Sequence, residues 1–158
     1  MTQRVPMTPE GHKNLRAELQ KLREVDMPQV VKEIGVAREH GDLSENAEYH
    51  AAKDRQGMIH ARVKYIEDAL SRAEVIDPSK LCGDRIKFGA HVTLLNLDSD
   101  AETAYQIVGP EESDLNRGRI SVTSPLARGL IGREVGDEVT INLPSGTRSY
   151  EIQDITWG

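Results

Sequence analysis

The sequence has little cysteine, few aromatic residues and no long apolar run. Cys82 is the one cysteine among 158 residues, which excludes an internal disulfide framework and a zinc site built on paired cysteines. A lone cysteine fits a reducing cytoplasm. No apolar stretch approaches the roughly 18 residues of a membrane span, and residues 1–10 lack the apolar core of a signal peptide. The sequence therefore predicts a soluble cytoplasmic protein that makes no use of a membrane.

An excess of positive charge is also absent. The chain has 20 Lys and Arg residues against 26 Asp and Glu residues, a formal net charge of −6. Because neutralisation of phosphates dominates affinity for free nucleic acid, tight unaided binding to DNA or RNA is not expected. A role on nucleic acid would need a protein partner. With one Phe, one Trp and four Tyr, the core must rest on Leu, Ile, Val and Ala.

Residues 45–73 carry the clearest periodic pattern. Side chains that are apolar or small at every position but one, Gln56, recur there at alternating steps of four and three, which is a heptad seam typical of a coiled coil. The positions are Ala52, Gln56, Ile59, Val63, Ile66, Leu70 and Ala73. A similar stripe upstream consists of Leu15, Leu19, Leu22, Val30, Ile34 and Ala37. Two long helices are predicted.

The ends of these helices have local signals. Thr8 can cap the first helix with Pro9 in its first position, where a missing amide costs no hydrogen bond. Pro28 predicts a kink or short break near residues 26–28. Gly41 suits a left-handed helix end, and Asp42 or Ser44 suits the next cap. The two helices should therefore turn back on each other as an antiparallel hairpin with its tip at residues 41–46.

After residue 78 the composition changes to β-branched runs punctuated by Gly, Pro and Asp. Strands are predicted at residues 91–97, 103–108, 120–123, 138–143 and 148–156. Ser124 and Pro125 read as the cap and first position of a short helix to about Ile131, closed by Gly132. The predicted class is α+β: a helical coiled-coil hairpin over residues 1–78, then a mainly antiparallel β domain over residues 79–158.

The hairpin tip is unusually acidic, and two interpretations of it remain open. Asp42 and Glu45 have the spacing of a capping box, and acids near a helix N-terminus complement the helix dipole. Alternatively, the two carboxylates present themselves together to a hard cation. Mg²⁺ needs six oxygen ligands, so two carboxylates in open water would hold it poorly unless a partner supplied the rest.

Two segments resemble a known family. Residues 37–53 read AREHGDLSENAEYHAAK, which is similar to the tip signature of the GreA/GreB family of bacterial transcript-cleavage factors. The resemblance continues through Gly89, through VTLLNL at residues 92–97 and through ISVTSPLARGLIG at residues 120–132. It implies a coiled-coil hairpin inserted into the secondary channel of bacterial RNA polymerase, and a C-terminal FKBP-like domain docked at the channel rim.

The same resemblance implies how the tip acts. Asp42 and Glu45 match the acidic pair that helps polymerase hold its second Mg²⁺ and orient a water that hydrolyses backtracked RNA. The free protein is then expected to be a monomer that binds no cofactor tightly and is no enzyme by itself. Ser44 and Asn46 would orient the pair by hydrogen bonding, or would only cap and turn the chain.

Two further sets of residues are implied by the resemblance. Arg38, Lys53 and Arg55, with Arg62 and Lys64, resemble the basic patch that approaches the nascent RNA 3′ end, and its small size is more similar to the GreA branch than to GreB. Helical spacing does not put all of them on one face, and each would serve equally as a solvated surface residue. The polymerase-docking segment is matched by Ile120, Ser121, Ser124 and Pro125, for which a core strand followed by a helix cap is an equally adequate reading.

Other functions remain to be compared with this one. A metal site at His40 and His50 is disfavoured because no metal-binding His spacing exists. A paralogue that only occupies the polymerase channel would be expected to have an altered tip, whereas Asp42 and Glu45 are both present. A prolyl isomerase built on the C-terminal domain would need an aromatic-lined pocket, and that domain has only Phe88, Tyr105, Tyr150 and Trp157.

Overall fold

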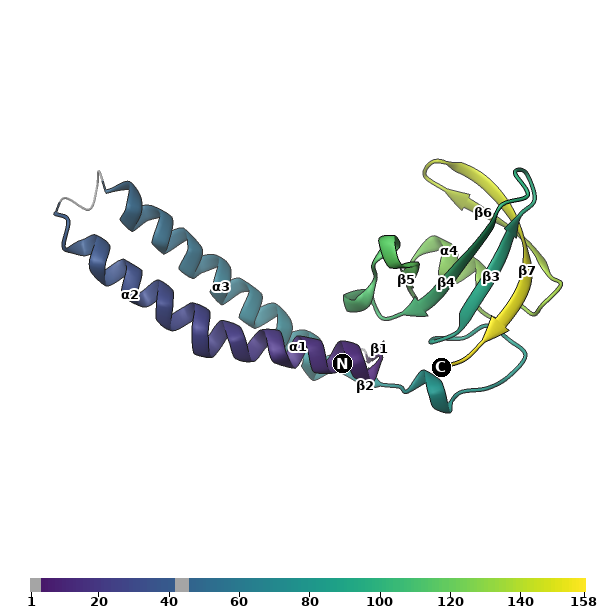
Figure 1. Ribbon diagram of the computed structural model, residues 1–158, viewed down its shortest axis with the longest axis horizontal. Coiled ribbons are helices and arrows are strands. Elements are labelled where there is room, and N and C mark those ends of the chain that lie inside the picture. The colour runs from purple at the N-terminus through teal and green to yellow at the C-terminus, as the bar shows by residue number, and fades with distance from the viewer. Residues whose placement is uncertain (1–3, 42–45) are drawn as a thin grey trace. The chain divides into compact units, whose positions relative to one another are not determined.

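The computed structural model describes residues 4–41 and 46–158 (Figure 1). Its contacts divide the chain into a helical unit, His12–Arg72, and a β unit made of Met1–Gly11 and Ala73–Gly158. The sequence predicted one boundary, between residues 78 and 79, and this division differs from it. The reason is that β1 (Val5–Met7) pairs in parallel with β2 (Ala73–Val75), which joins both ends of the helical segment to the β unit.

The helical unit is an antiparallel hairpin. Its first arm consists of α1 (Pro9–Lys21), a π-helical turn (Leu22–Asp26) and α2 (Met27–Arg38), and its second arm is α3 (Ala47–Arg72). Figure 1 shows α2 and α3 running side by side in opposite directions. Their seam buries Val30, Ile34, Ala52 and Ile59, which confirms the predicted heptad pattern.

The irregularity predicted near Pro28 is a π-helical turn rather than a break. In this turn the amide of Met27 donates to the carbonyl of Leu22, five residues earlier, and the helical path continues directly into α2. Pro28 lies in the first turn of α2, where its missing N–H and its fixed φ are tolerated. The wider turn thus accommodates the proline without ending the helix.

The β unit is built on a five-stranded sheet in the order β5-β4-β3-β7-β6. The strands are β3 (His91–Asn96), β4 (Glu102–Val108), β5 (Arg119–Ser121), β6 (Glu138–Leu143) and β7 (Gly146–Thr156). Neighbouring strands are antiparallel except β4 and β5, which are parallel. The predicted α+β class, with a mainly antiparallel sheet, is confirmed.

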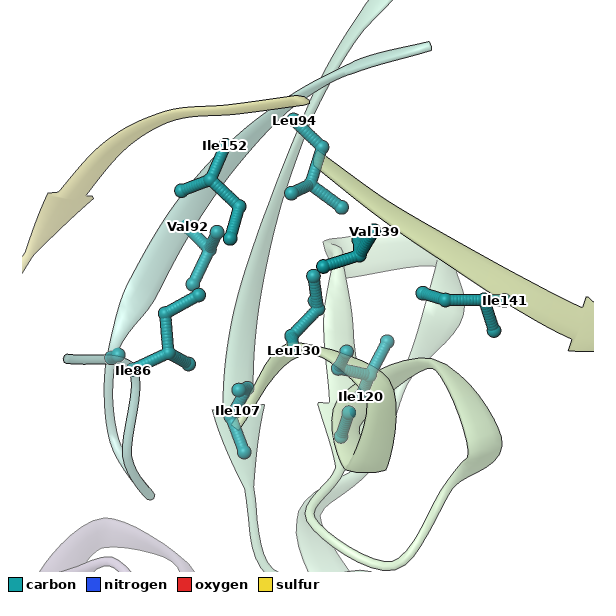
Figure 2. Packing of buried hydrophobic residues seen from close by; sticks show 11 residues of the cluster. Ile86, Val92, Leu94, Ile107, Ile120, Leu130, Val139, Ile141 and Ile152 are labelled. Carbon is teal, nitrogen blue, oxygen red and sulfur yellow. The ribbon is translucent and has the colours of Figure 1, made fainter. Parts of the chain in front are cut away.

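An aliphatic core lies between the sheet and α4 (Pro125–Leu130). Alternate residues of β3 and β6 point into it, as the two-residue period of a strand requires, so Val92, Leu94, Val139 and Ile141 are all buried. They belong to one cluster with Leu130 of α4, and Figure 2 shows Leu130 next to Val139. The core therefore rests on aliphatic side chains, as the composition predicts.

Local signals also position α4. The Ser124 hydroxyl accepts a hydrogen bond from the amide of Ala127 at 3.2 Å, which caps the helix, and Pro125 occupies its first turn. Gly132 has φ +87° just beyond the helix. The short helix predicted after Ser124 is thus confirmed. Within the described residues, no helix combines the length and apolarity needed to cross a membrane.

Candidate functional site: the tip of the helical hairpin

The hairpin tip is the first place where the sequence predicts function. Asp42, Ser44 and Glu45 lie outside the described residues, so their predicted roles stay predictions. Before the tip in sequence, α2 ends at Arg38. The amides of His40 and Gly41 donate back to the carbonyls of Ala37 and Arg38. Gly41 has φ +104°, the left-handed conformation predicted for it.

Asn46 follows the tip in sequence and directly precedes α3. Its side-chain oxygen accepts from the amide of Tyr49 at 3.1 Å, and its carbonyl accepts from the amide of His50 at 3.1 Å, so Asn46 is the N-cap of α3. Its side-chain Nδ2 donates to the carbonyl of Ala37 at 2.5 Å. One side chain therefore caps α3 and joins it to the end of α2.

This arrangement corrects the predicted cap. Because α3 begins at Ala47 with Asn46 before it, the prediction that Asp42 or Ser44 caps the second helix is wrong. Asparagine is as good a cap as aspartate, and the choice could not be made from local sequence. The capping explanation for the acidity of the tip is weaker as a result.

Aromatic and imidazole rings surround the described part of the tip. The Arg38 guanidinium lies 5.9 Å from the ring centre of Tyr49, and the rings of Tyr49 and His50 meet edge to face at 5.5 Å. His40 Nδ1 lies 3.7 Å from a carboxylate oxygen of Glu48, an ion pair when His40 is protonated. Among residues 4–41 and 46–158 there is no group of three or more His, Cys, Asp or Glu arranged to hold a metal ion.

The predicted basic residues fall on two sides of the hairpin. Lys53 follows Tyr49 by one helical turn, about 40° around α3, so it shares the side of the hairpin on which Arg38 meets Tyr49. Its Nζ donates to the Gln56 side chain at 3.1 Å. Arg55 instead lines a groove of about 550 Å³ between α2 and α3, together with Glu33 and Glu48. By helical spacing Arg38 and Lys53 therefore lie on the same side of the hairpin, whereas Arg55 lines the groove between α2 and α3.

Two of the basic residues have carboxylate partners across the hairpin. Arg55 Nη1 lies 2.8 Å from Glu33, and Arg62 forms two hydrogen bonds with Glu18, at 2.6 and 3.0 Å. Hydrogen bonding from Arg62, assisted by its charge and opposed by partial burial, holds the pKa of the Glu18 carboxyl below its ordinary value of 4.5. These pairs tie the two arms of the hairpin together, so both arginines have a structural role.

The docking residues predicted on the β unit differ in exposure. Ile120 is only 3% exposed and packs in the core, so its side chain is not available to a partner. The Ser121 and Thr123 hydroxyls lie 2.8 Å apart, and Ser124 caps α4 beside the exposed ring of Pro125. Only Ser121, Ser124 and Pro125 of the predicted set can present side-chain atoms at the surface.

One polar cluster of the β unit carries no sequence signal. Glu112 ends a 3₁₀ turn (Pro110–Glu112), and its carboxylate is buried against Thr8 and Arg119. Two adjacent acids after a proline normally indicate an exposed turn. The partners lie far apart along the chain, so no local pattern could have revealed the contact.

Comparison with known proteins places both units in one family. The family model described as transcription elongation factor, N-terminal, matches residues 5–75, and the model described as transcription elongation factor, GreA/GreB, C-term, matches residues 80–157. Together they account for almost the whole chain.

Individual relatives are similar over their full length. The chain is 54% identical to transcription elongation factor GreA of Phenylobacterium zucineum, covering 98% of this chain and 99% of that protein. It is 51% identical to GreA of Rhizobium leguminosarum bv. viciae, covering all of both chains. Among solved structures, GreA factor homolog 1 of Thermus thermophilus is 29% identical over 98% of this chain and 99% of that one, with a TM-score of 0.45.

Proposed function

The chain belongs to the GreA/GreB family of transcription elongation factors, and we propose that it stimulates cleavage of backtracked nascent RNA by bacterial RNA polymerase. In this proposal the helical hairpin enters the secondary channel of the polymerase and carries its tip to the active centre. The protein contributes part of a site and is not an enzyme alone. Its place of action is the cytoplasm.

The chemistry of the tip follows from its donor set. Asp42 and Glu45 offer carboxylate oxygens, which are the ligands that Mg²⁺ prefers, but two carboxylates cannot supply all six. The free protein is therefore expected to bind Mg²⁺ weakly, with the ion shared between the tip and the polymerase. When bound, a second Mg²⁺ lowers the pKa of water and stabilises charge on the reacting phosphate. The two acids would hold that ion and accept a hydrogen bond from the attacking water.

The observation that carries the proposal is the frame around the tip. Asn46 links the end of α2 to the start of α3 through hydrogen bonds to Ala37 and Tyr49. This linkage holds the two arms together at the ends of the tip segment whose sequence contains Asp42 and Glu45. Because Asn46 caps α3, the start of this helix does not depend on Asp42 or Ser44 as its cap. Such a frame suits carboxylates that must be delivered to another protein's active centre.

The basic residues nearest the tip have a separate role in this proposal. Arg38 and Lys53 share one side of the hairpin and would approach the phosphates of the nascent RNA 3′ end. Arg55 and Arg62 already pair with carboxylates, so they contribute less to RNA binding. Affinity for the polymerase would come mainly from the surface of the β unit at Ser121, Ser124 and Pro125, because the chain carries net negative charge.

The direct test uses a stalled and backtracked elongation complex with Mg²⁺. Addition of the protein should release short 3′ RNA fragments, whereas the protein with free RNA should release none. The double variant Asp42→Asn, Glu45→Gln should keep its fold and its polymerase binding but lose most of the stimulation. Asp54→Asn, an exposed acid on α3, removes a similar charge and should retain full activity.

The same experiment separates the alternatives. A protein that binds the complex without releasing RNA would be a channel-occupying inhibitor instead. Two cavities of the β unit, of about 370 and 280 Å³, are lined by no Phe, Tyr or Trp side chain, so they offer no aromatic pocket for a proline substrate. Turnover of a proline peptide by the free protein would nevertheless favour the isomerase function.

A further inference from the structure

The helical unit has a second groove, which the proposed function does not use. It measures about 870 Å³, and residues of α1, the π-helical turn and α3 line it. We call it the α1 groove. The charged or titratable residues described in its lining are His12, Lys13, Arg16, Arg23 and Glu24. Basic side chains therefore prevail on this surface, although the whole chain has a net charge of −6.

The three Lys and Arg residues of the groove differ in their partners. Arg23 Nη2 lies 2.5 Å from a carboxylate oxygen of Glu67, so its charge is already paired. Lys13 and Arg16 are both exposed, and within residues 4–41 and 46–158 neither forms an ion pair. They are three residues apart on α1, so their side chains are neighbours and their like charges repel. The stability of α1 gives no reason for this arrangement.

The uncharged lining of the groove indicates which kind of partner fits. It includes the half-buried side chains of Leu19 and Leu70 and the exposed Ala17, and none of its described residues is aromatic. Proteins that hold single-stranded nucleic acid normally stack the bases on aromatic rings. Aliphatic groups beside unpaired cations instead suit a peptide segment that combines acidic and aliphatic side chains.

We propose that the α1 groove is a second contact with the polymerase and receives an acidic segment of the polymerase surface. The choice of the polymerase as the partner rests on the proposed function. Figure 1 shows α1 at one end of the hairpin and the end of α2 at the other, and Arg16 precedes Arg38 by roughly 30 Å of helix. A hairpin whose tip reaches the active centre leaves this groove nearer the entrance of the channel. The contact adds affinity without touching RNA.

The first test measures affinity for a stalled elongation complex. Lys13→Glu and Arg16→Glu should each weaken binding about fivefold at low salt, because like charges then face each other across the contact. The difference should shrink at high salt, which screens exposed charges. Lys21→Glu is the matched control, since Lys21 is exposed on α1 but does not line the groove. It should change affinity by less than about twofold, and circular dichroism checks that every variant folds.

Glu24 gives a prediction of opposite sign. Its carboxylate accepts a hydrogen bond from the Gln20 side chain at 3.2 Å and lies in the lining of the groove, where it would repel an acidic partner. Glu24→Gln should therefore bind about twofold more tightly. Unchanged or weaker binding by Glu24→Gln would contradict an acidic partner. Unchanged affinity of Lys13→Glu and Arg16→Glu, or an equal loss in Lys21→Glu, would overturn the proposal as well.

The second test identifies what lies against the groove. Ala17→p-benzoylphenylalanine places a photo-crosslinker at an exposed position of the lining, and mass spectrometry of the irradiated complex locates the attached segment. A polymerase segment rich in Asp and Glu is expected. A crosslink to RNA, or to a segment without acids, would refute the proposal.

The rate of RNA release keeps the two proposals apart. At saturating protein, Lys13→Glu and Arg16→Glu should release RNA at the maximal rate of the unsubstituted protein, because the tip is unchanged. A lower maximal rate with unchanged affinity would contradict a docking role. Failure of the unsubstituted protein to release RNA would refute the proposed function, while the affinities and the crosslink would still decide the role of the groove.

Discussion

Asn46 shows how much one side chain can contribute at the end of a helical hairpin. Replacing it with Ala removes both the cap of α3 and the bond to Ala37. We expect Asn46→Ala to lower the free energy of unfolding of the helical unit by about 0.5–2 kcal/mol, the usual value of a cap. Urea unfolding followed by far-UV circular dichroism measures this.

Asn46→Asp provides the comparison. Aspartate keeps the capping oxygen but cannot donate to the carbonyl of Ala37, so it should be less destabilising than Ala. Equal destabilisation by Ala and Asp would mean that the bond across the tip, and not the cap, carries the stability.

The ion pair between Glu18 and Arg62 predicts a pH dependence. The folded-state pKa of Glu18 lies below its ordinary value of 4.5, so the pair stabilises the folded state above pH 4.5 and this contribution is lost as pH falls through the lower folded value. Both side chains are about 40% exposed, so the effect should not exceed about 0.5 kcal/mol. The difference in unfolding free energy between the unsubstituted protein and Glu18→Gln should be constant near neutral pH and shrink in acid. A difference that grows on acidification would contradict the assignment.

Among the structural elements, the seam between α2 and α3 depends on a few buried aliphatic residues. Ile59 is 8% exposed in this seam, whereas the adjacent Met58 is 70% exposed. Ile59→Ala should destabilise the helical unit by about 2–5 kcal/mol, because it removes buried apolar groups and leaves a cavity. Met58→Ala should change stability by less than about 0.5 kcal/mol. Chemical denaturation of the two variants decides whether this seam holds the hairpin together.

The elements with strong local patterns were predictable from sequence. The heptads, the cap at Thr8 and the alternating strands identified most helices and strands, because each pattern reports burial on one face of its own element. β1 and β2 were missed, since three residues each are too few for periodicity and their parallel pairing joins distant segments.

The candidate site was predictable to a lesser degree. The position of Asn46 at the tip was predicted, with capping as one of its two open roles, but the cap of the second helix was assigned to Asp42 or Ser44, which have the same local chemistry. The burial of Ile120 and the pairing of Glu112 depend on tertiary packing that no short motif encodes.

For the whole molecule, the proposed function divides the work between the units. A fragment of residues 12–72 keeps the hairpin and its acidic tip but lacks Ser121, Ser124 and Pro125. We expect it to bind polymerase more weakly than the intact chain in a competition assay. Circular dichroism of the fragment checks that its helices form. A folded fragment with the affinity of the intact protein would contradict docking through the β unit.

The pairing of Thr8 with Glu112 also has a consequence for the order of events during synthesis. At typical translation rates, the 104 residues that follow Thr8 up to and including Glu112 take roughly 5–20 seconds to make. The helical hairpin needs only contacts among earlier residues and can form on the ribosome during that interval. β1 can pair with β2 once Val75 has emerged, but Thr8 must wait for Glu112. One of the first residues to emerge therefore gains its carboxylate partner only after the hairpin is complete, and a nascent chain stalled before Glu112 would have a formed hairpin whose first cap, Thr8, lacks that partner.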